Sequence, residues 1–196
     1  MWMVLAGVAC ALIASGCSSG TSSSSGVDNN GTSTSLPSWT KSLGAGVTVA
    51  PPRPEAAGNA SPGGIAMTYI ADINVAKLSA LCPLMDPAAQ KACQQTIGGA
   101  SSTGIKFKNA ALGYIVTDGN EALVGLTGTY CTPNGTPPCS TNTDPSALFS
   151  SGNTFATLFT QALAAQNPPS SSNAYSLFPC IKVNSDWYFD LPASDF

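Results

Sequence analysis

The chain of 196 residues contains no histidine, and only 9% of its residues are charged, against about 25% in an average soluble protein. The absence of histidine excludes Ser–His and Cys–His nucleophile systems, and it removes the commonest partner of cysteine in zinc sites. No CxxC pair is present either, so we expect no metal site. Carboxylates and tyrosines are what remain for acid–base chemistry.

Basic residues are also scarce. The seven Lys and Arg residues never cluster beyond Lys106 and Lys108, and the net charge is −3. Binding to nucleic acid or to an anionic lipid surface requires many cations on one face of a protein. We therefore expect no nucleic-acid partner, and a surface made polar mainly by Ser, Thr, Asn, Gln and Gly.

The N-terminal apolar run covers residues 2–14 and is shorter than the about 20 apolar residues that a membrane-spanning helix needs. It ends in Ala14-Ser15-Gly16-Cys17, which resembles the lipobox of bacterial lipoproteins. The resemblance implies a signal peptide over residues 1–16, and a Cys17 that carries a diacylglyceryl group with acyl chains such as palmitate. The alternatives are an ordinary secretory signal peptide and a transmembrane anchor.

Residues 17–64 are rich in Ser, Thr, Gly and Pro and show no helical or strand period. Such a composition predicts a flexible linker between the lipidated Cys17 and one globular domain over residues 65–196. Within it, Ser38-Trp39-Thr40-Lys41 matches the S-x-x-K pattern of penicillin-binding enzymes, but no S-D-N or K-T-G follows. We interpret that match as chance.

Five cysteines remain in the predicted domain: Cys82, Cys93, Cys131, Cys139 and Cys180. In an oxidising extracytoplasmic compartment they predict two disulfides and one unpaired thiol. We favour a Cys82–Cys93 bridge, because Asp86-Pro87 is a cap and first-position pair that folds the second helix back on the first. For Cys180 a structural role is favoured over a reactive one, because few cations are present to lower its pKa.

The periodicity of apolar residues predicts an α+β domain. Helices are expected over residues 65–81, with a break near Asn74, and over 88–97 and 155–166. Strands are expected over 105–116, with a bulge at 109–111, and over 121–131, 175–183 and 187–191. The predicted fold is a curved four-stranded antiparallel sheet packed against about three helices.

Three segments carry a further likeness: Met67-Thr68-Tyr69-Ile70-Ala71-Asp72-Ile73-Asn74, Val116-Thr117-Asp118-Gly119-Asn120-Glu121-Ala122 and Val183-Asn184-Ser185-Asp186-Trp187-Tyr188. Two helices, a bent hairpin and a closing aromatic hairpin resemble the nuclear transport factor 2-like (cystatin-like) cone of many short bacterial lipoproteins. The resemblance covers about residues 65–191 and implies helices over a concave sheet face that encloses an apolar pocket.

The resulting prediction is a lipid-anchored, extracytoplasmic cell-envelope protein of non-enzymatic binding or interaction type. Its expected partners are the membrane, through the anchor, and either an apolar small molecule or an envelope protein; no cofactor is expected. The alternative is a small enzyme that acts on an apolar substrate by Tyr/Asp chemistry, as in ketosteroid isomerase, through Tyr69, Asp72, Tyr114 and Asp190. The pocket-lining candidates are Tyr69, Tyr114, Phe155, Phe159 and Trp187.

Overall fold

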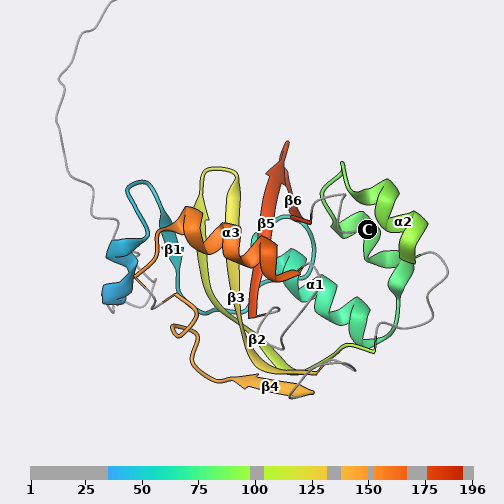
Figure 1. Cartoon of the computed structure of the whole chain (residues 1–196), viewed down its shortest axis with the longest axis horizontal. Helices are drawn as coiled ribbons and strands as arrows, with labels where there is room; N and C mark the ends of the chain where they lie inside the picture. Colours follow the sequence, from blue (N-terminus) through green and yellow to red (C-terminus); the bar gives the residue numbers. More distant parts are fainter. Residues whose placement is uncertain (1–34, 98–103, 132–137, 150–151, 167–175, 192–196) are drawn as a thin grey trace, which may run out of the picture.

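A computed structural model of the chain describes residues 35–97, 104–131, 138–149, 152–166 and 176–191. The fold is α+β, with an open antiparallel sheet and helices packed against it (Figure 1). The elements in chain order are η1 (Ser38–Ser42), β1 (Thr48–Ala50), α1 (Pro62–Asn74), η2 (Leu78–Ala80), η3 (Cys82–Leu84), α2 (Gln90–Ile97), β2 (Lys106–Asp118), β3 (Glu121–Cys131), β4 (Cys139–Asn142), α3 (Phe155–Gln166), β5 (Leu177–Val183) and β6 (Asp186–Phe189).

The sheet has the strand order β1-β2-β3-β5-β6, and β4 pairs with β3 outside this path. One half of β3, residues 121–125, pairs with β5, and the other half, residues 128–131, pairs with β4. The four predicted strands are β2, β3, β5 and β6. The predicted count of four was too low, because the short strands β1 and β4 also belong to the sheet.

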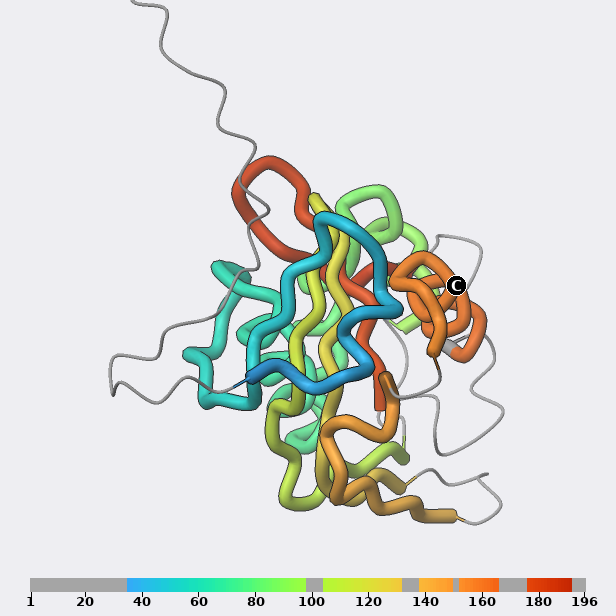
Figure 2. Tube along the Cα trace, turned by 90° about the vertical axis from the view of Figure 1, so that its left-hand side faces the viewer, coloured from blue at the N-terminus to red at the C-terminus, as the bar shows by residue number. Residues whose placement is uncertain are grey.

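Side chains alternate across the sheet and divide the core into two layers. On β3, Ala122, Val124 and Leu126 pack with α1 and α2, whereas Leu123 packs with α3. Figure 2 shows α3 on one side of the strands and α1 on the other. The helices therefore cover both faces of the sheet, where the predicted cone has them on the concave face alone.

Residues 35–64 belong to the fold, which corrects the prediction of a linker up to residue 64 and a domain that starts at 65. Leu43 is 2% exposed in the layer that contains α3, and its carbonyl accepts a hydrogen bond from the Phe155 backbone N–H (2.9 Å). Strand β1 pairs with residues 115–117 of β2. These contacts join residues that are far apart in the sequence, and local periodicity therefore cannot predict them. Residues 1–34, including Cys17, lie outside the described residues.

Helix α1 begins where a serine caps it. The Ser61 hydroxyl accepts a hydrogen bond from the Gly64 N–H (3.0 Å), and Pro62 occupies the first turn. The helix ends at Asn74, where a break was predicted, and Ala76 follows in a left-handed conformation (φ 56°); the short helix η2 follows in place of the predicted continuation to residue 81. A Cβ at Gly64 would lie 2.6 Å from the Ala56 carbonyl oxygen, so residues 55–58 run directly over the start of the helix.

The hairpin of β2 and β3 contains the predicted bulge. The register shifts between Lys108 and Ala111, where Asn109 has a φ of 53°, and it shifts again between Leu112 and Ile115. Gly128 faces the first bulge with a φ of 114°, and a Cβ on it would lie 2.6 Å from the Asn109 carbonyl oxygen. The bulge therefore requires glycine at position 128.

Two disulfides are present among the described residues. The predicted bridge between Cys82 and Cys93 is confirmed (Cα–Cα 5.5 Å) and joins η3 to α2. The second joins Cys131 to Cys139, which are directly opposite each other on β3 and β4 (Cα–Cα 4.0 Å). Cys180 is a buried free thiol.

Candidate functional site

The five predicted pocket residues do not line a common cavity. Tyr69 and Trp187 are buried in the layer that contains α1, whereas Phe155 and Phe159 are buried in the layer that contains α3, with Tyr114 packed against them. The Tyr69 ring packs against Phe178 and Phe189, at centroid distances of 5.4 and 5.2 Å. Because the sheet separates the two groups, the pocket expected from the cone is not assembled from these side chains.

The Tyr/Asp set proposed for an enzyme is divided in the same way. Tyr69 and Tyr114 lie on opposite faces of the sheet. Asp72 is half-buried on α1, and Asp190 follows the end of β6. The four side chains therefore do not converge on one substrate position.

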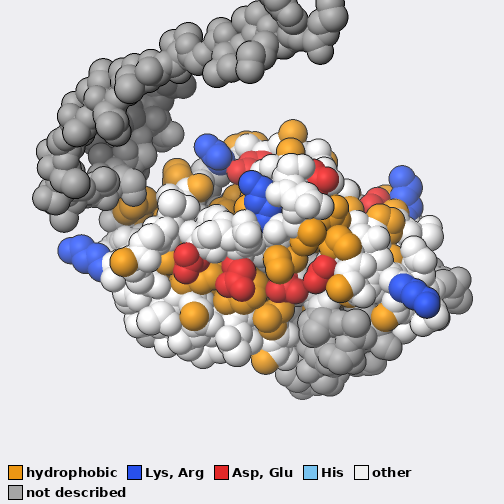
Figure 3. All heavy atoms as spheres, turned by 90° about the horizontal axis from the view of Figure 1, so that it is seen from above, with side chains coloured by type: hydrophobic (Ala, Val, Ile, Leu, Met, Phe, Trp, Pro, Cys, Tyr) orange, Lys and Arg blue, Asp and Glu red, His pale blue; other side chains and the backbone are white. Residues whose placement is uncertain are grey.

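Asp190 is electrostatically the most perturbed carboxyl of the described residues. Burial, and then the charges of Asp86 and Glu121, raise its pKa to about 6. Figure 3 shows acidic side chains gathered among hydrophobic ones on one face, while most basic side chains lie at the margins of that view. The neighbouring Cys180 thiol is fully buried, and burial together with the charge of Asp190 raises its pKa far above the ordinary range. Cys180 is therefore a protonated, structural cysteine.

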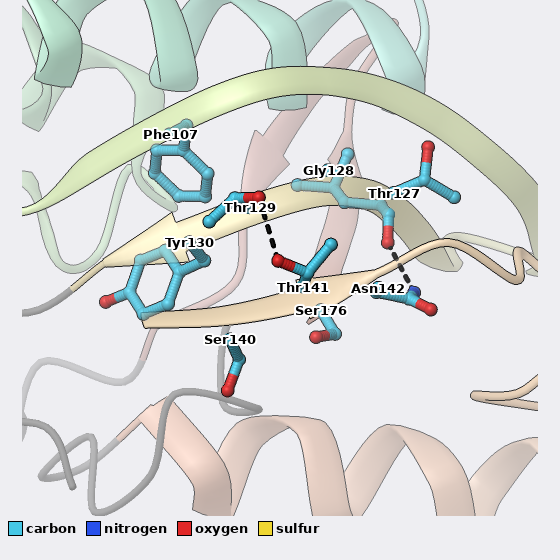
Figure 4. A pocket seen from close by; sticks show the side chains of 10 residues that line it. Phe107, Thr127, Gly128, Thr129, Tyr130, Ser140, Thr141, Asn142 and Ser176 are labelled. Atoms are coloured by element: carbon cyan, nitrogen blue, oxygen red, sulfur yellow. Dashed lines mark hydrogen bonds between the residues drawn. The ribbon is translucent and has the colours of Figure 1, made fainter. Parts of the chain in front are cut away.

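A small cavity lies where β3 changes partner from β5 to β4 (Figure 4). Its volume is about 30 Å³, which suits a water molecule and is too small for an organic ligand. Two hydrogen bonds stabilise its polar wall. One joins the Thr129 and Thr141 hydroxyls (2.9 Å), and in the other the Asn142 amide donates to the Leu126 carbonyl (2.7 Å). At this junction, the Asn142 side chain thus supplies a hydrogen bond to β3 that a paired strand would otherwise supply.

A larger groove of about 410 Å³ lies between α1 and β2, and we call it the α1–β2 groove. This volume is within the range of about 300–1,000 Å³ that is usual for small-molecule sites. The groove is lined by three separate segments of the chain, which supply Pro52, Arg53, Pro54, Glu55, Met67, Ala110, Ala111 and Leu112.

The outer wall of the groove is formed by a proline-rich segment that follows β1. Pro51, Pro52 and Pro54 have no N–H to donate, so the chain after β1 leaves the ladder. Glu55 fixes this wall to the start of α1, because its carboxylate accepts a hydrogen bond from the Ser61 hydroxyl (2.6 Å). The Glu55 side chain is only 11% exposed, while its ion-pair partner Arg53 (3.4 Å) is 64% exposed.

The inner wall is part of the β2 edge that no described strand covers. Strand β1 pairs only with residues 115–117. At the other end, the Asn74 side chain donates to the Phe107 carbonyl (3.0 Å) and accepts from the Phe107 N–H (2.9 Å). Between these two closures, residues 108–114 have β3 on one side and no described strand on the other.

Sequence reasoning did not find this groove. Its lining residues are distant in the chain and are mostly Pro, Ala, Met and Leu, which form no motif. The only available signals were the cluster of prolines at 51–54 and the bulge at 109–111, which was predicted but not connected to a binding surface. Both features shape the groove in the structure.

No protein-family model matches the chain, and no curated protein or solved structure shows significant similarity to it. In the described part of the chain, no group of three or more acidic or cysteine side chains is placed to hold a metal ion. None of the helices described is long and apolar enough to cross a membrane. The α1–β2 groove, whose volume is in the usual range for small-molecule sites, is the candidate functional site.

Proposed function

We propose that the chain is a lipid-anchored, extracytoplasmic protein of the cell envelope that acts as a non-enzymatic binding module through the α1–β2 groove. The observation that carries the binding proposal is a preformed, mainly apolar groove of about 410 Å³ on an uncovered strand edge. The lipobox-like Ala14-Ser15-Gly16-Cys17 supports the anchor. The two disulfides support an oxidising compartment, where such bonds persist.

The chemistry of the lining favours binding over catalysis. Its charged groups are Arg53 and Glu55, which pair with each other, and the Glu55 carboxylate is also held by Ser61. The rest of the lining consists of Pro, Ala, Met and Leu side chains. Such a surface favours a ligand with an apolar body, and exposed Arg53 favours a negative group on that ligand.

We also propose a relation of the sheet to the nuclear transport factor 2-like cone. The meander of β2, β3, β5 and β6 in chain order, with α1 before it, supports this relation. The position of α3 on the opposite face would then be an addition to the cone. The relation adds nothing to the choice of ligand, because fold alone does not give function.

The anchor is tested by expressing the full chain in a bacterium and labelling it with radioactive palmitate. Wild-type protein and the control Cys10→Ser are expected to incorporate label and to fractionate with membranes, because only Cys17 receives the diacylglyceryl group. Cys17→Ser is expected to lose both properties. Equal labelling and membrane retention of Cys17→Ser and wild type would refute the anchor.

Binding by the groove is tested with 8-anilinonaphthalene-1-sulfonate, a probe that joins an apolar body to an anion. Saturable binding is expected, and Ala111→Phe should weaken it because the added ring fills the groove. Ala156→Phe, on an exposed position of α3, is the matched control and should bind like wild type. Equal affinity of wild type and both variants would show that the groove is not the binding site.

A further inference from the structure

We propose that the natural ligand of the α1–β2 groove is an extended peptide segment of a partner protein, which adds to the sheet as a short strand beside Leu112. This inference rests on the proposed function and names the chemical class of the ligand. It follows from the uncovered backbone in the groove, from the small side chains along it and from the charges at its margin.

The register of β2 determines which backbone groups face the groove. Ala111 pairs with Thr127 of β3, and the Thr127 hydroxyl donates to the Ala111 carbonyl (3.3 Å), which therefore faces β3. In an antiparallel pair, backbone groups of successive residues point to opposite sides. The N–H and C=O of Leu112 therefore point away from β3, toward the groove, where an added strand would bond both of them.

At the two ends of this β2 edge, the backbone N–H and C=O groups that point away from β3 have hydrogen-bond partners. Phe107 also directs its N–H and C=O away from β3, and the Asn74 amide satisfies both. Residues 115–117 are satisfied by β1. Residues 108–114 lie between these closures and contain the two register shifts of β2, so an added strand would be short and centred on Leu112.

The side chains along the edge also favour a peptide. Ala110 and Ala111 are small and allow another backbone to approach closely, while Met67 and Leu112 offer an apolar surface to one of its side chains. An acyl chain would fill the apolar part of the groove. It would leave the Leu112 N–H and C=O without a partner, however, and an unpaired buried backbone group is unfavourable.

The charges beside the groove specify the peptide further. Arg53 lies in the lining and Lys108 is exposed on the uncovered stretch of β2. Lys106, just beyond it, donates to the Asn74 carbonyl (3.1 Å). The one acidic residue of the lining, Glu55, is already engaged by Ser61 and Arg53. This local positive charge on a chain of net charge −3 favours a partner segment that carries Asp or Glu next to its apolar residues.

The experiment selects peptides from a random linear decapeptide display library on the full-chain protein, with Ala111→Phe protein as the counter-selection. The most enriched peptide is synthesised in three forms: unmodified, and with backbone N-methyl groups on either of the two alternating sets of residues. Affinity is measured by calorimetry, and the Leu112 amide is followed by NMR. Sodium laurate is titrated in parallel as an acyl-chain probe.

We expect enriched peptides that combine β-branched or aromatic residues with Asp or Glu, and that slow exchange of the Leu112 amide at least about tenfold. One N-methylated form should bind at least about tenfold more weakly, because it loses the bonds to β2, while the other should bind like the unmodified peptide. Arg53→Ala should weaken acidic peptides more than versions with Asn or Gln.

Three results would overturn strand addition: no enrichment over Ala111→Phe, equal affinity of all three backbone forms, or an unchanged Leu112 amide. If the sulfonate probe or laurate still binds in the groove, the proposed function stands and only its peptide ligand is refuted. If none of these ligands binds, the proposed function fails together with this inference.

Discussion

The outer edge at β6 and the part of β2 that lies beyond the short edge strand β1 differ in how their backbone groups are covered. At the β6 edge, the Asp86 N–H donates to the Phe189 carbonyl (2.9 Å), and the Trp187 N–H donates to the Asn59 carbonyl (2.8 Å). At the β2 edge, β1 and the Asn74 amide close the two ends, and residues 108–114 between them remain without a strand.

This difference shows that the fold has several ways to close an edge, namely a loop, a short strand and a side-chain amide. An uncovered edge invites pairing with another chain, and proteins usually protect it. Here the uncovered stretch coincides with the α1–β2 groove and with small side chains at Ala110 and Ala111. The two register shifts and Lys108 in this stretch limit uncontrolled pairing, and the binding role of the β2 edge is the one that we propose.

The largest effect is expected from opening the β6 edge. The Cys82–Cys93 bridge constrains the segment that carries Asp86, so its removal in Cys82→Ala/Cys93→Ala should lower the free energy of unfolding by about 3 kcal/mol. Denaturant unfolding measures this loss, and exchange of the Asp86 amide, which donates to Phe189, should accelerate. In the control Cys131→Ala/Cys139→Ala, exchange of the Asp86 amide should stay slow; equal acceleration in both variants would contradict a local role.

The next effect concerns the bulge that shapes the groove. Gly128→Ala should destabilise the protein by about 2 kcal/mol, because the left-handed backbone is strained and the new Cβ meets the Asn109 carbonyl. Gly46→Ala is the matched control, since Gly46 also has a positive φ (87°) but no atom within 4 Å of its Cβ position. An equal decrease in the thermal unfolding temperature of Gly128→Ala and Gly46→Ala would show that the bulge tolerates a side chain.

A smaller effect is expected at the closed end of the β2 edge. Asn74→Ala leaves the Phe107 N–H and C=O without their side-chain partner, and should cost about 1.5 kcal/mol. Exchange of the Phe107 amide should accelerate. In the control Asn142→Ala, which removes a hydrogen bond at the β3–β4 junction, that amide should keep its wild-type rate.

The smallest expected effect is a pH dependence of the free energy of unfolding, caused by Asp190 near the β6 edge. Because the folded-state pKa of Asp190 is raised to about 6, above the unfolded value of about 3.9, the folded protein binds this proton more tightly than the unfolded chain does. The resulting stabilisation is present below about pH 4 and is lost as the pH rises through 6.

Asp190→Asn should therefore raise the free energy of unfolding by about 1 kcal/mol at pH 7, allowing for solvent screening of the half-buried carboxyl, and by little at pH 4. Urea unfolding at the two pH values measures the difference. Asp86→Asn removes one of the two repelling charges and should give part of the same gain. A gain that is equal at both pH values would contradict the assigned cause.

Where the fold depends on local patterns, the sequence was sufficient to predict it. The apolar spacing of residues 155–166 predicted α3, and the period-two patterns predicted the two hairpins and the bulge. The Cys82–Cys93 bridge was also predicted, because the capping residues at Asp86-Pro87 fix the chain reversal between the two cysteines.

Features that depend on distant contacts were missed. Leu43 and β1 lie in a segment whose composition resembles a linker, and they are ordered by α3 and β2. Strand β4 has the polar sequence Cys-Ser-Thr-Asn, and it forms through pairing with β3. Assignment of the aromatic residues to one pocket was wrong for a related reason: helical and strand periods do not tell on which side of a sheet a helix packs.

Amide hydrogen exchange of the full chain, resolved at Leu112, tests the central claim most directly. The claim is that the β2 edge is uncovered between Phe107 and Ile115 and is used for binding. In the free protein, the Leu112 amide should exchange much faster than those of Phe107 and Trp187, which have acceptors, and a bound peptide should slow it. Protection of Leu112 in the free protein equal to that of Trp187 would contradict the account.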